Sequence, residues 1–250
     1  MTDPLFLLDG LTDPLPEVGA RVVLDGTEGR HAAVVRRIRP GEMIMIADGR
    51  GRGVRGSVIE VRPSSVVVEV ARYLSAPAEA LRFVAVQALA KGDRSELAVE
   101  MMTEMGVSQI VPWRASRSIV RWSEERVARS LSKWRSTVRE AAKQSRRLTV
   151  PLVSEPLTTR QLVERVASAD LTLVLHEESD ESIAKVDLPE AGTVLIIIGP
   201  EGGISTDELS ELTRAGARPV SISDGVLRTS TAGVVALAGL KLRQEPSIAS

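Results

Sequence analysis

The sequence Leu195-Ile-Ile-Ile-Gly-Pro-Glu-Gly-Gly203 decides the fold that we expect for this chain. Four branched apolar residues in succession cannot alternate between core and solvent, so they predict a strand buried on both faces, as in a parallel sheet. Gly199, Pro200, Gly202 and Gly203 then end the strand in a tightly shaped loop. Such a loop, between a buried strand and the start of a helix, is a common ligand site.

Strands and helices alternate around this stretch, from residue 80 to 250. Ser205-Thr-Asp-Glu208 has the form of a capping box and predicts a helix that ends near Gly216. Buried strands are predicted at Leu171–Leu175 and Pro219–Ile222. The alternation predicts an α/β domain on a parallel sheet. If these strands are neighbours, the loops that begin at His176, Gly199 and Ser223 converge.

The region before them follows the same alternation. Leu81–Leu89 predicts a strand, and Asp93–Met105 a helix that Gly106 ends, with Leu97, Met101 and Met105 on its apolar side. Ile110–Pro112 resumes a strand. Ser123–Lys143 is the strongest helix pattern. Its buried stripe is predicted to consist of four residues: Val127, Leu131, Trp134 and Val138.

Residues 1–73 have a different character, because short β-type runs recur there at close spacing and predict a small β-barrel or sandwich. One helical interruption is expected at His31–Ile38, with Val34, Val35 and Ile38 facing the core. Tyr73–Glu79 has the composition of a linker. We therefore expect two domains, at residues 1–73 and 80–250.

Composition excludes several classes of protein. The 250 residues contain no cysteine, which removes disulfides, thiolate metal sites and cysteine nucleophiles. Only His31 and His176 could supply imidazole, so no metal centre is expected. No apolar run approaches the length of a membrane span and no signal sequence opens the chain, so a cytoplasmic protein without a membrane partner is expected.

Charge is strongly polarised along a chain that is nearly neutral overall. Arg114–Arg147 contains eleven basic and three acidic residues, whereas residues 148–250 contain eight and fifteen. The cationic face of the predicted helix at Ser123–Lys143 is either an ordinary solvated face or an RNA-binding surface, and its uncompensated charge favours RNA. Arg50, Arg52 and Arg55 leave the same two alternatives open. The candidate RNA-binding residues are Arg36, Arg37, Lys91, Arg117, Arg139, Lys143, Arg146 and Arg147.

The nature of the ligand is narrowed by the motifs that are missing. Neither Gly-x-Gly-x-x-Gly nor Gly-x-x-x-x-Gly-Lys-Ser/Thr is present, which argues against dinucleotide and nucleoside triphosphate sites. Alone, the glycine loop could be a purely structural turn. Ile198-Gly-Pro-Glu-Gly-Gly203 is, however, paired with Val226-Leu-Arg-Thr-Ser-Thr-Ala232.

With these two motifs, the chain resembles the bacterial 16S ribosomal RNA (uracil-N3)-methyltransferases of the SPOUT superfamily. Three further segments agree with the resemblance: Lys91-Gly-Asp93; Thr103-Glu-Met-Gly-Val107 followed by Ile110-Val-Pro112 and Arg117-Ser118; and Glu140-Ala-Ala-Lys-Gln-Ser145. The family usually has glutamate at the position of Ser230 and glycine at that of Arg146. The resemblance covers residues 80–240, and the N-terminal region fits the family's PUA-like RNA-binding domain.

The resemblance implies a trefoil-knotted domain that binds S-adenosylmethionine, a homodimer, and 16S rRNA of the small ribosomal subunit as substrate. Carried over by position, the cofactor-binding residues are Leu175, His176, Ile198, Gly199, Pro200, Glu201, Gly202, Gly203, Ile222, Ser223, Val226, Leu227 and Arg228. Arg228 is the candidate for steering a phosphate or the uracil, and Glu201 for orienting the cofactor or a neighbouring loop.

The implied chemistry is attack by uracil N3 on the methyl group, which chiefly requires positioning and loss of the N3 proton. The absence of cysteine agrees with this, because methylation at C5 of a pyrimidine ordinarily needs a cysteine adduct. Two alternatives stay open. One is 2′-O-ribose methylation by a protein of the same superfamily, and the other is a non-catalytic RNA-binding factor for ribosome assembly.

Overall fold

The structure, a computed structural model, describes residues 3–11 and 13–244, which form two compact units. The first contains the chain up to Pro77 together with Glu140–Val150, and the second contains Ala78–Arg139 and the chain from Pro151 onward. The return of Glu140–Val150 to the first unit has no counterpart in the contiguous division expected from the sequence.

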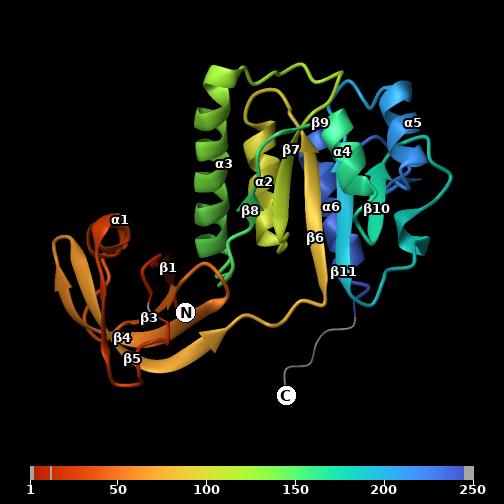
Figure 1. Ribbon diagram of the computed structural model, residues 1–250. Coiled ribbons are helices and arrows are strands. Elements are labelled where there is room, and N and C mark those ends of the chain that lie inside the picture. Colours follow the sequence, from red (N-terminus) through yellow and green to blue (C-terminus); the bar gives the residue numbers. More distant parts are fainter. Residues whose placement is uncertain (1–2, 12, 245–250) are drawn as a thin grey trace. The chain divides into compact units, whose positions relative to one another are not determined.

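The first unit is built on an open, curved five-stranded sheet (Figure 1). Its strand order is β1-β3-β4-β5-β2, and only the β1–β3 pair is parallel. Two register irregularities bend β4 against β5. At the first of them a β-carbon on Gly56 would lie 2.3 Å from the carbonyl oxygen of Glu69, so this close approach requires glycine. The strands are β1 (Leu5–Leu7), β2 (Arg21–Leu24), β3 (Met43–Ala47), β4 (Arg52–Arg62) and β5 (Ser65–Ser75).

The β-type runs predicted for this region are confirmed as strands, but in the described residues they form a half-barrel whose edges, β1 and β2, do not pair with each other. The linker prediction was wrong at its start, because β5 continues to Ser75.

The helical segment of this unit consists of α1 (Gly26–Arg30) and the π-helical turn η1 (His31–Val35). The expected inward side was wrong for two residues, since Val34 and Val35 are 50% and 68% exposed, whereas Ala32 and Ile38 are buried. The physical reason is the wider π-helical turn, which rotates successive side chains differently from the 3.6-residue period that the prediction assumed.

The second unit contains the predicted parallel sheet. Its strand order is β12-β10-β11-β6-β7-β8, with β9 paired to β7, and every pair is parallel. Its strands are β6 (Leu81–Ala88), β7 (Gln109–Arg114), β8 (Leu152–Val153), β9 (Leu157–Thr158), β10 (Leu171–Leu175), β11 (Gly192–Ile198) and β12 (Arg218–Val220). Residues Val194–Ile198 of β11 are all buried, as expected for a strand covered on both faces.

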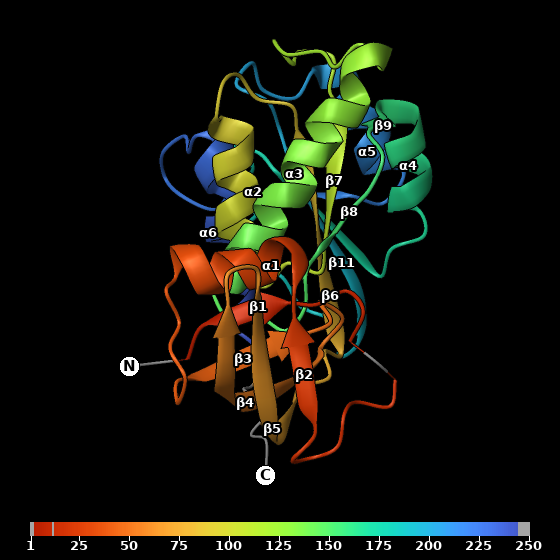
Figure 2. The ribbon, with the colours of Figure 1, turned by 90° about the vertical axis from the view of Figure 1, so that its left-hand side faces the viewer.

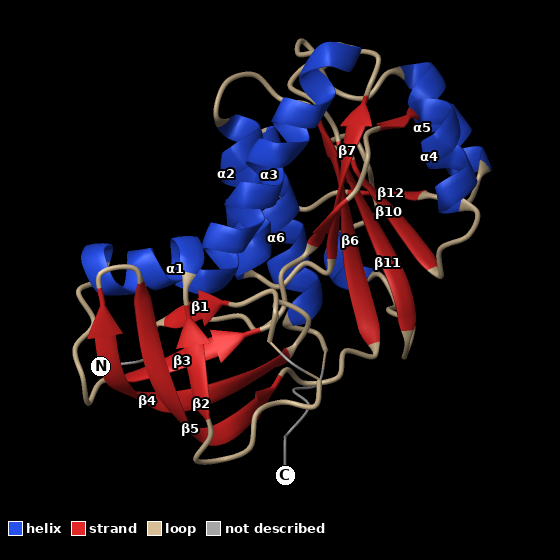
Figure 3. Ribbon diagram, turned by 60° about the vertical axis from the view of Figure 1, so that its left-hand side comes forward, coloured by secondary structure: helices blue, strands red, loops and turns tan. Residues whose placement is uncertain are grey.

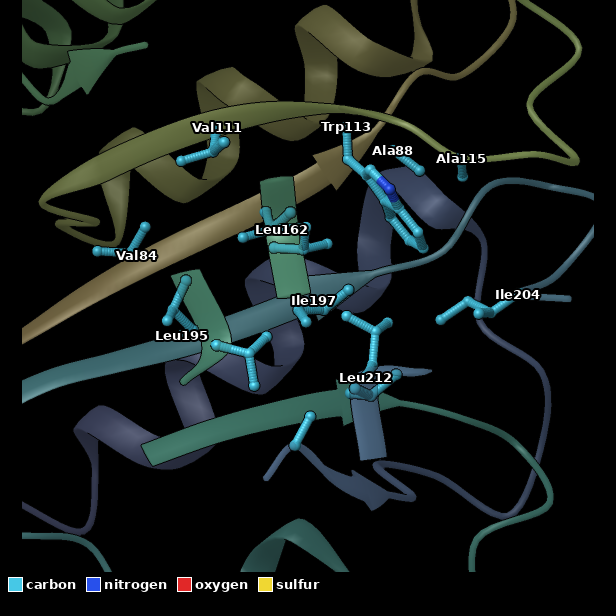
Figure 4. Packing of buried hydrophobic residues seen from close by; sticks show 14 residues of the cluster. Val84, Ala88, Val111, Trp113, Ala115, Leu162, Leu195, Ile197, Ile204 and Leu212 are labelled. Atoms are coloured by element: carbon cyan, nitrogen blue, oxygen red, sulfur yellow. The ribbon is translucent and has the colours of Figure 1, made fainter. Parts of the chain in front are cut away.

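Helices cover both faces of this sheet, with α4 and α5 on one side and α2 and α6 on the other (Figures 2 and 3). Side chains from β7, α4, β11 and α5 meet in one core, which includes Trp113, Leu162, Ile197 and Leu212 (Figure 4). The helical elements are α2 (Arg94–Glu104), α3 (Glu124–Gln144), α4 (Thr159–Val166), η2 (Ile183–Lys185), α5 (Thr206–Arg214) and α6 (Thr229–Lys241). Within the described ranges, none of them is long and apolar enough to cross a bilayer.

For α3 and α2 the buried side of the helix can be compared with the side predicted from the sequence. The stripe on α3 is confirmed for Leu131, Trp134 and Val138, which are at most 2% exposed, whereas Val127 near the start of the helix is half-buried. The side of α2 was wrong: Leu97 is 46% exposed, and the buried residues of α2 include Ala98 and Met102 instead. Apolar residues recur at helical spacing on both sides of α2, and packing against α6 selects the side of Met102, for which Gly233 of α6 leaves room.

Candidate functional site

The carboxyl ends of three adjacent parallel strands form the candidate site. β10 lies between β12 and β11, so the loops that follow all three converge, as expected. They enclose a pocket of about 270 Å³. The predicted residues that line it are Leu175, His176, Ile198, Gly199, Pro200, Glu201, Gly203, Val226, Leu227 and Arg228. Five further residues that were not predicted from the sequence also line it: Arg94, Glu177, Ile204, Thr229 and Ala232.

Three predicted residues lie elsewhere. Ile222 and Ser223 line a smaller adjoining pocket of about 60 Å³, which shares Leu175 and His176 with the larger one. Gly202 turns away from the pocket and packs on Arg117, whose carbonyl oxygen would lie 3.0 Å from a β-carbon at position 202. Glycine at 202 therefore serves contact between two loops.

Glu201 anchors the glycine loop to the residues that precede α2. Its Oε1 accepts hydrogen bonds from the backbone amide of Lys91 (3.0 Å) and from Nη1 of Arg94 (3.3 Å). The Glu201 side chain is 18% exposed. This geometry agrees with the predicted role of orienting a neighbouring loop, and it leaves Arg228, the residue before α6, as the pocket-lining cation with no ion-pair partner in the described chain.

A chain of buried hydrogen bonds fixes the carbonyl group of Gly199. Thr229 donates from Oγ1 to that carbonyl oxygen (2.7 Å), and Gln87 donates from Nε2 to Oγ1 of Thr229 (3.0 Å). Gln87 is fully buried in β6. Because buried polar groups need partners, this chain holds the glycine loop, α6 and the central strand in one arrangement. The signal in the sequence was a glutamine within the apolar run that follows Arg82 in β6.

Glu208 of α5 organises the other side of the glycine loop. Its carboxylate closes the predicted capping box with Ser205, and it also accepts hydrogen bonds from Ser116 Oγ (2.6 Å), the Ser116 amide (2.8 Å) and Thr159 Oγ1 (2.8 Å). Burial acts to raise the pKa of Glu208, but the hydrogen bonds from Ser116, Thr159 and Ser205 outweigh it and lower the pKa. Glu208 is therefore ionised at neutral pH, and its carboxylate holds Ser116, the residue before Arg117, in place.

The candidate RNA-binding residues fall into both units. A pocket of about 170 Å³ in the first unit is lined by Arg36, Lys143 and Arg146. Arg37 and Arg147 belong to the same unit but do not line this pocket. Lys91, Arg117 and Arg139 belong to the second unit. Two cations from the other basic cluster are ion-paired: Arg52 with Asp13 and Asp48, and Arg55 with Asp3. Their pairing favours the structural alternative for these two residues.

Ser230, where the family usually has glutamate, is buried in the first turn of α6 and does not line the pocket. Among the described residues, no group of three or more histidine, aspartate and glutamate side chains could hold a metal ion.

Comparison with known proteins agrees with this architecture. Residues 77–241 match the model of a family described as an RNA methyltransferase domain. The chain is 46% identical, over 90% of its length and 87% of the relative's, to ribosomal RNA small subunit methyltransferase E of Mycobacterium bovis.

Two solved structures are also similar. Ribosomal RNA small subunit methyltransferase E from Neisseria gonorrhoeae, bound to S-adenosyl methionine, has a TM-score of 0.86 and 27% identity, covering 96% of this chain and 98% of that one. A methyltransferase from Legionella pneumophila in complex with the bound cofactor SAM has a TM-score of 0.84 and 29% identity, covering 97% and 98%. The parallel sheet with its pocket at the carboxyl ends of β10, β11 and β12 thus belongs to a member of the ribosomal RNA small subunit methyltransferase E family.

Proposed function

We propose that this chain transfers a methyl group from S-adenosylmethionine to N3 of a specific uridine in 16S rRNA of the small ribosomal subunit. The observation that carries the proposal is the pocket at the ends of β10, β11 and β12, formed by the paired motifs that the sequence shares with the uracil-N3 methyltransferases. The S-adenosyl methionine bound to the similar Neisseria gonorrhoeae enzyme supports the choice of cofactor.

The residues present fit this cofactor. Leu175, Ile198, Ile204 and Leu227 give the pocket apolar walls suited to an adenine ring. Glycine at 199 keeps space open, because a β-carbon there would lie 2.8 Å from Cγ1 of Ile204. Of the two carboxylates on the lining, Glu201 is paired with Arg94, so Glu177 is the one that would complement the sulfonium cation.

In this proposal the loop groups bind and orient, and few charged side chains take part. The cofactor is held mainly by backbone groups of two segments, Ile198 to Gly203 and residues 222–228. Glycines in the first segment let the main chain approach a ligand closely. S-adenosylmethionine supplies an electrophilic methyl group when it is bound. Arg228 steers a phosphate or the uracil at the pocket mouth, and Glu201 keeps the glycine loop in place through Lys91 and Arg94.

The proposal includes the finer features implied by the resemblance. The second unit is a trefoil-knotted SPOUT domain, the first is a PUA-like RNA-binding domain, and the active protein is a cytoplasmic homodimer. The resemblance in the paired motifs supports these features, and the parallel order of the strands β12-β10-β11-β6-β7-β8 is compatible with such a domain.

The test has two stages. Calorimetry with S-adenosylmethionine should give saturable binding to the full-length protein, and absence of binding would favour the non-catalytic alternative. Small ribosomal subunits should then incorporate one labelled methyl group from S-adenosylmethionine per subunit. Mapping should place it on N3 of a uridine, whereas a methyl group on a ribose 2′-oxygen would establish the other alternative.

A further inference from the structure

We propose that the pocket of the first unit is a phosphate site that grips the backbone of the RNA substrate at one phosphodiester group. It is lined by Pro4, Leu5, Phe6, His31, Arg36, Glu140, Lys143, Gln144 and Arg146. This inference rests on the proposed function for the identity of the polyanion, but its geometry is independent of the methyl-donor pocket, with which it shares no residue.

The floor of this pocket is shaped by residues that are themselves fixed. Leu5 and Phe6 belong to β1 and are 4% and 2% exposed. Phe6 holds the ring of His31 edge-on at 6.2 Å between centroids. A rigid floor lets polar groups at the rim converge on one small ligand, because their positions are set before binding.

Lys143 provides a buried ammonium group, part of whose hydrogen-bonding capacity is used by neighbouring carboxylates. Its side chain is 8% exposed, and Nζ lies 2.7 Å from Glu28 Oε1 and 2.8 Å from Glu140 Oε1. An ammonium group has three donors, so one remains after these two bonds. Lys143 shares its one positive charge between Glu28 and Glu140, so these three groups together carry one net negative charge, which the two arginines of the pocket exceed.

Two guanidinium groups complete the site. Arg36 and Arg146 are exposed and have no ion-pair partner among the residues that the structure describes. A guanidinium presents a planar fork of donors that matches phosphate oxygens. The pocket therefore offers two uncompensated cations, a remaining ammonium donor and an imidazole, which suits one phosphate group rather than a neutral ligand.

Arg146 has a backbone conformation that is energetically unfavourable for any residue with a side chain other than glycine's hydrogen. It lies just beyond the end of α3 with φ +57°, in the left-handed region that favours glycine. Its amide donates to the carbonyl oxygen of Lys143 at 3.1 Å, so this conformation closes the helix end. Arginine here is less favourable for the backbone than glycine, and the pocket gives the cation a use.

Arg37 supplies a matched comparison within the same unit. It also has positive φ, +52°, and it is exposed, but it does not line the pocket. Replacing either arginine by glycine removes one positive charge and one strained backbone position. A general electrostatic attraction predicts equal effects on RNA binding, whereas a phosphate site in the pocket predicts a larger effect for Arg146.

The experiment measures filter binding of 16S rRNA to the full-length protein at several salt concentrations. We expect Arg146→Gly to weaken binding about tenfold and to reduce the slope of log Kd against log salt by about one, as for loss of one phosphate contact. Arg36→Gln should have a similar effect, and Arg37→Gly should weaken binding about threefold or less. Thermal denaturation should show no loss of stability for either glycine variant, because each relieves a strained backbone.

Further measurements separate the alternatives. Equal effects of Arg146→Gly and Arg37→Gly would overturn the phosphate site, and S-adenosylmethionine binding could still be intact. A protein that fails to bind S-adenosylmethionine but shows the expected Arg146 effect would contradict the proposed function alone. Inorganic phosphate at millimolar concentration should compete with RNA for wild-type protein and less for Arg146→Gly. Phosphate binding that leaves RNA affinity independent of Arg146 would identify a site for free anions and would overturn the inference.

Discussion

The two pockets of this protein are built in different ways. The pocket at the ends of β10, β11 and β12 is shaped mainly by main chain: a glycine loop, a carbonyl group fixed by Thr229, and a helix held by its capping box. The pocket of the first unit is shaped by side chains, with two arginines and a buried lysine around a floor from β1. A neutral, shaped pocket suits a small molecule that must be oriented, whereas convergent cations suit a polyanion that must be held.

The difference teaches where each function is vulnerable. Main-chain shape is sensitive to added volume and to loss of the groups that fix the loops, because backbone groups cannot be replaced singly. A charged pocket is sensitive to the loss of individual cations. Substitutions that add volume should therefore affect the pocket at the ends of β10, β11 and β12 most, and substitutions that remove a cation should affect the pocket of the first unit most.

Gly199→Val should produce the largest effect. A β-carbon at 199 would lie 2.8 Å from Cγ1 of Ile204, which is itself buried and lines the pocket, so the added atoms displace Ile204 or enter the cofactor space. We expect a cost of about 3 kcal/mol from overpacking, equivalent to about 100-fold in S-adenosylmethionine affinity. Calorimetry measures the affinity, and circular dichroism should show that the variant remains folded.

Gly239→Ala is the matched control for that substitution. Gly239 is exposed in the interior of α6, and a β-carbon there would meet no atom within 4 Å. Alanine should stabilise the helix by about 0.5–1 kcal/mol and leave S-adenosylmethionine affinity unchanged. Full affinity in Gly199→Val would show that the glycine loop does not shape the cofactor pocket.

Glu208→Gln should have the next largest effect, on stability. An amide in this position replaces an acceptor oxygen by a donor that faces Ser116 or Ser205, so we expect destabilisation by about 2–3 kcal/mol at pH 7 in urea unfolding. The lowered pKa of Glu208 in the folded protein fixes the pH dependence. Its contribution to stability is present above the ordinary value of 4.5 and is lost as the pH falls through the lower folded pKa.

The difference in stability between the wild-type protein and Glu208→Gln should therefore be largest near neutrality and shrink below about pH 4.5. A difference that does not change with pH would mean that the charge of Glu208 has no part in holding the loop of Ser116.

Arg94→Ala should have the smallest effect and sharpens the comparison most directly. Arg94 lines the main-chain pocket, but its side chain is 47% exposed and its ion pair with Glu201 is 3.3 Å long. The amide of Lys91 still bonds Glu201 in the variant. We expect S-adenosylmethionine affinity to fall about threefold or less, as for an exposed ion pair. If calorimetry shows a fall as large as the RNA-binding effect of Arg146→Gly, the two pockets do not differ in the way described.

The elements of the second unit were predictable because their patterns are local. Four apolar residues at Leu195–Ile198 require burial on both faces, and Ser205 with Glu208 marks the start of a helix whatever packs on it. The stripe of α3 was predictable for the same reason. The faces of α2 and η1 were not, because Gly233 of α6 selects the side of α2 that carries Met102, and a π-helical turn changes the angular spacing at Val34 and Val35.

The candidate site divides along the same line. Ten of its lining residues follow from motifs next to strand ends, but Arg94 enters the pocket from α2, which is distant in the sequence from all three loops. Thr229 lies inside the second motif, yet its part in the site depends on its hydrogen bonds with Gln87 and Gly199. Gly202 belongs to the motif and yet contacts Arg117, because the turn that fits the pocket must face another loop on its other side.

By itself, the sequence determined which strands are buried, where three loops end and how charge is distributed, because burial patterns, capping residues and charge are properties of neighbouring residues. Only the tertiary structure decided that β10 lies between β11 and β12, that Glu208 joins three segments, and that Arg36 meets Arg146 around one pocket. These facts depend on contacts between residues about 20 to 110 positions apart. Such contacts are determined by the packing of the whole unit, which the pattern of any single stretch of sequence does not specify.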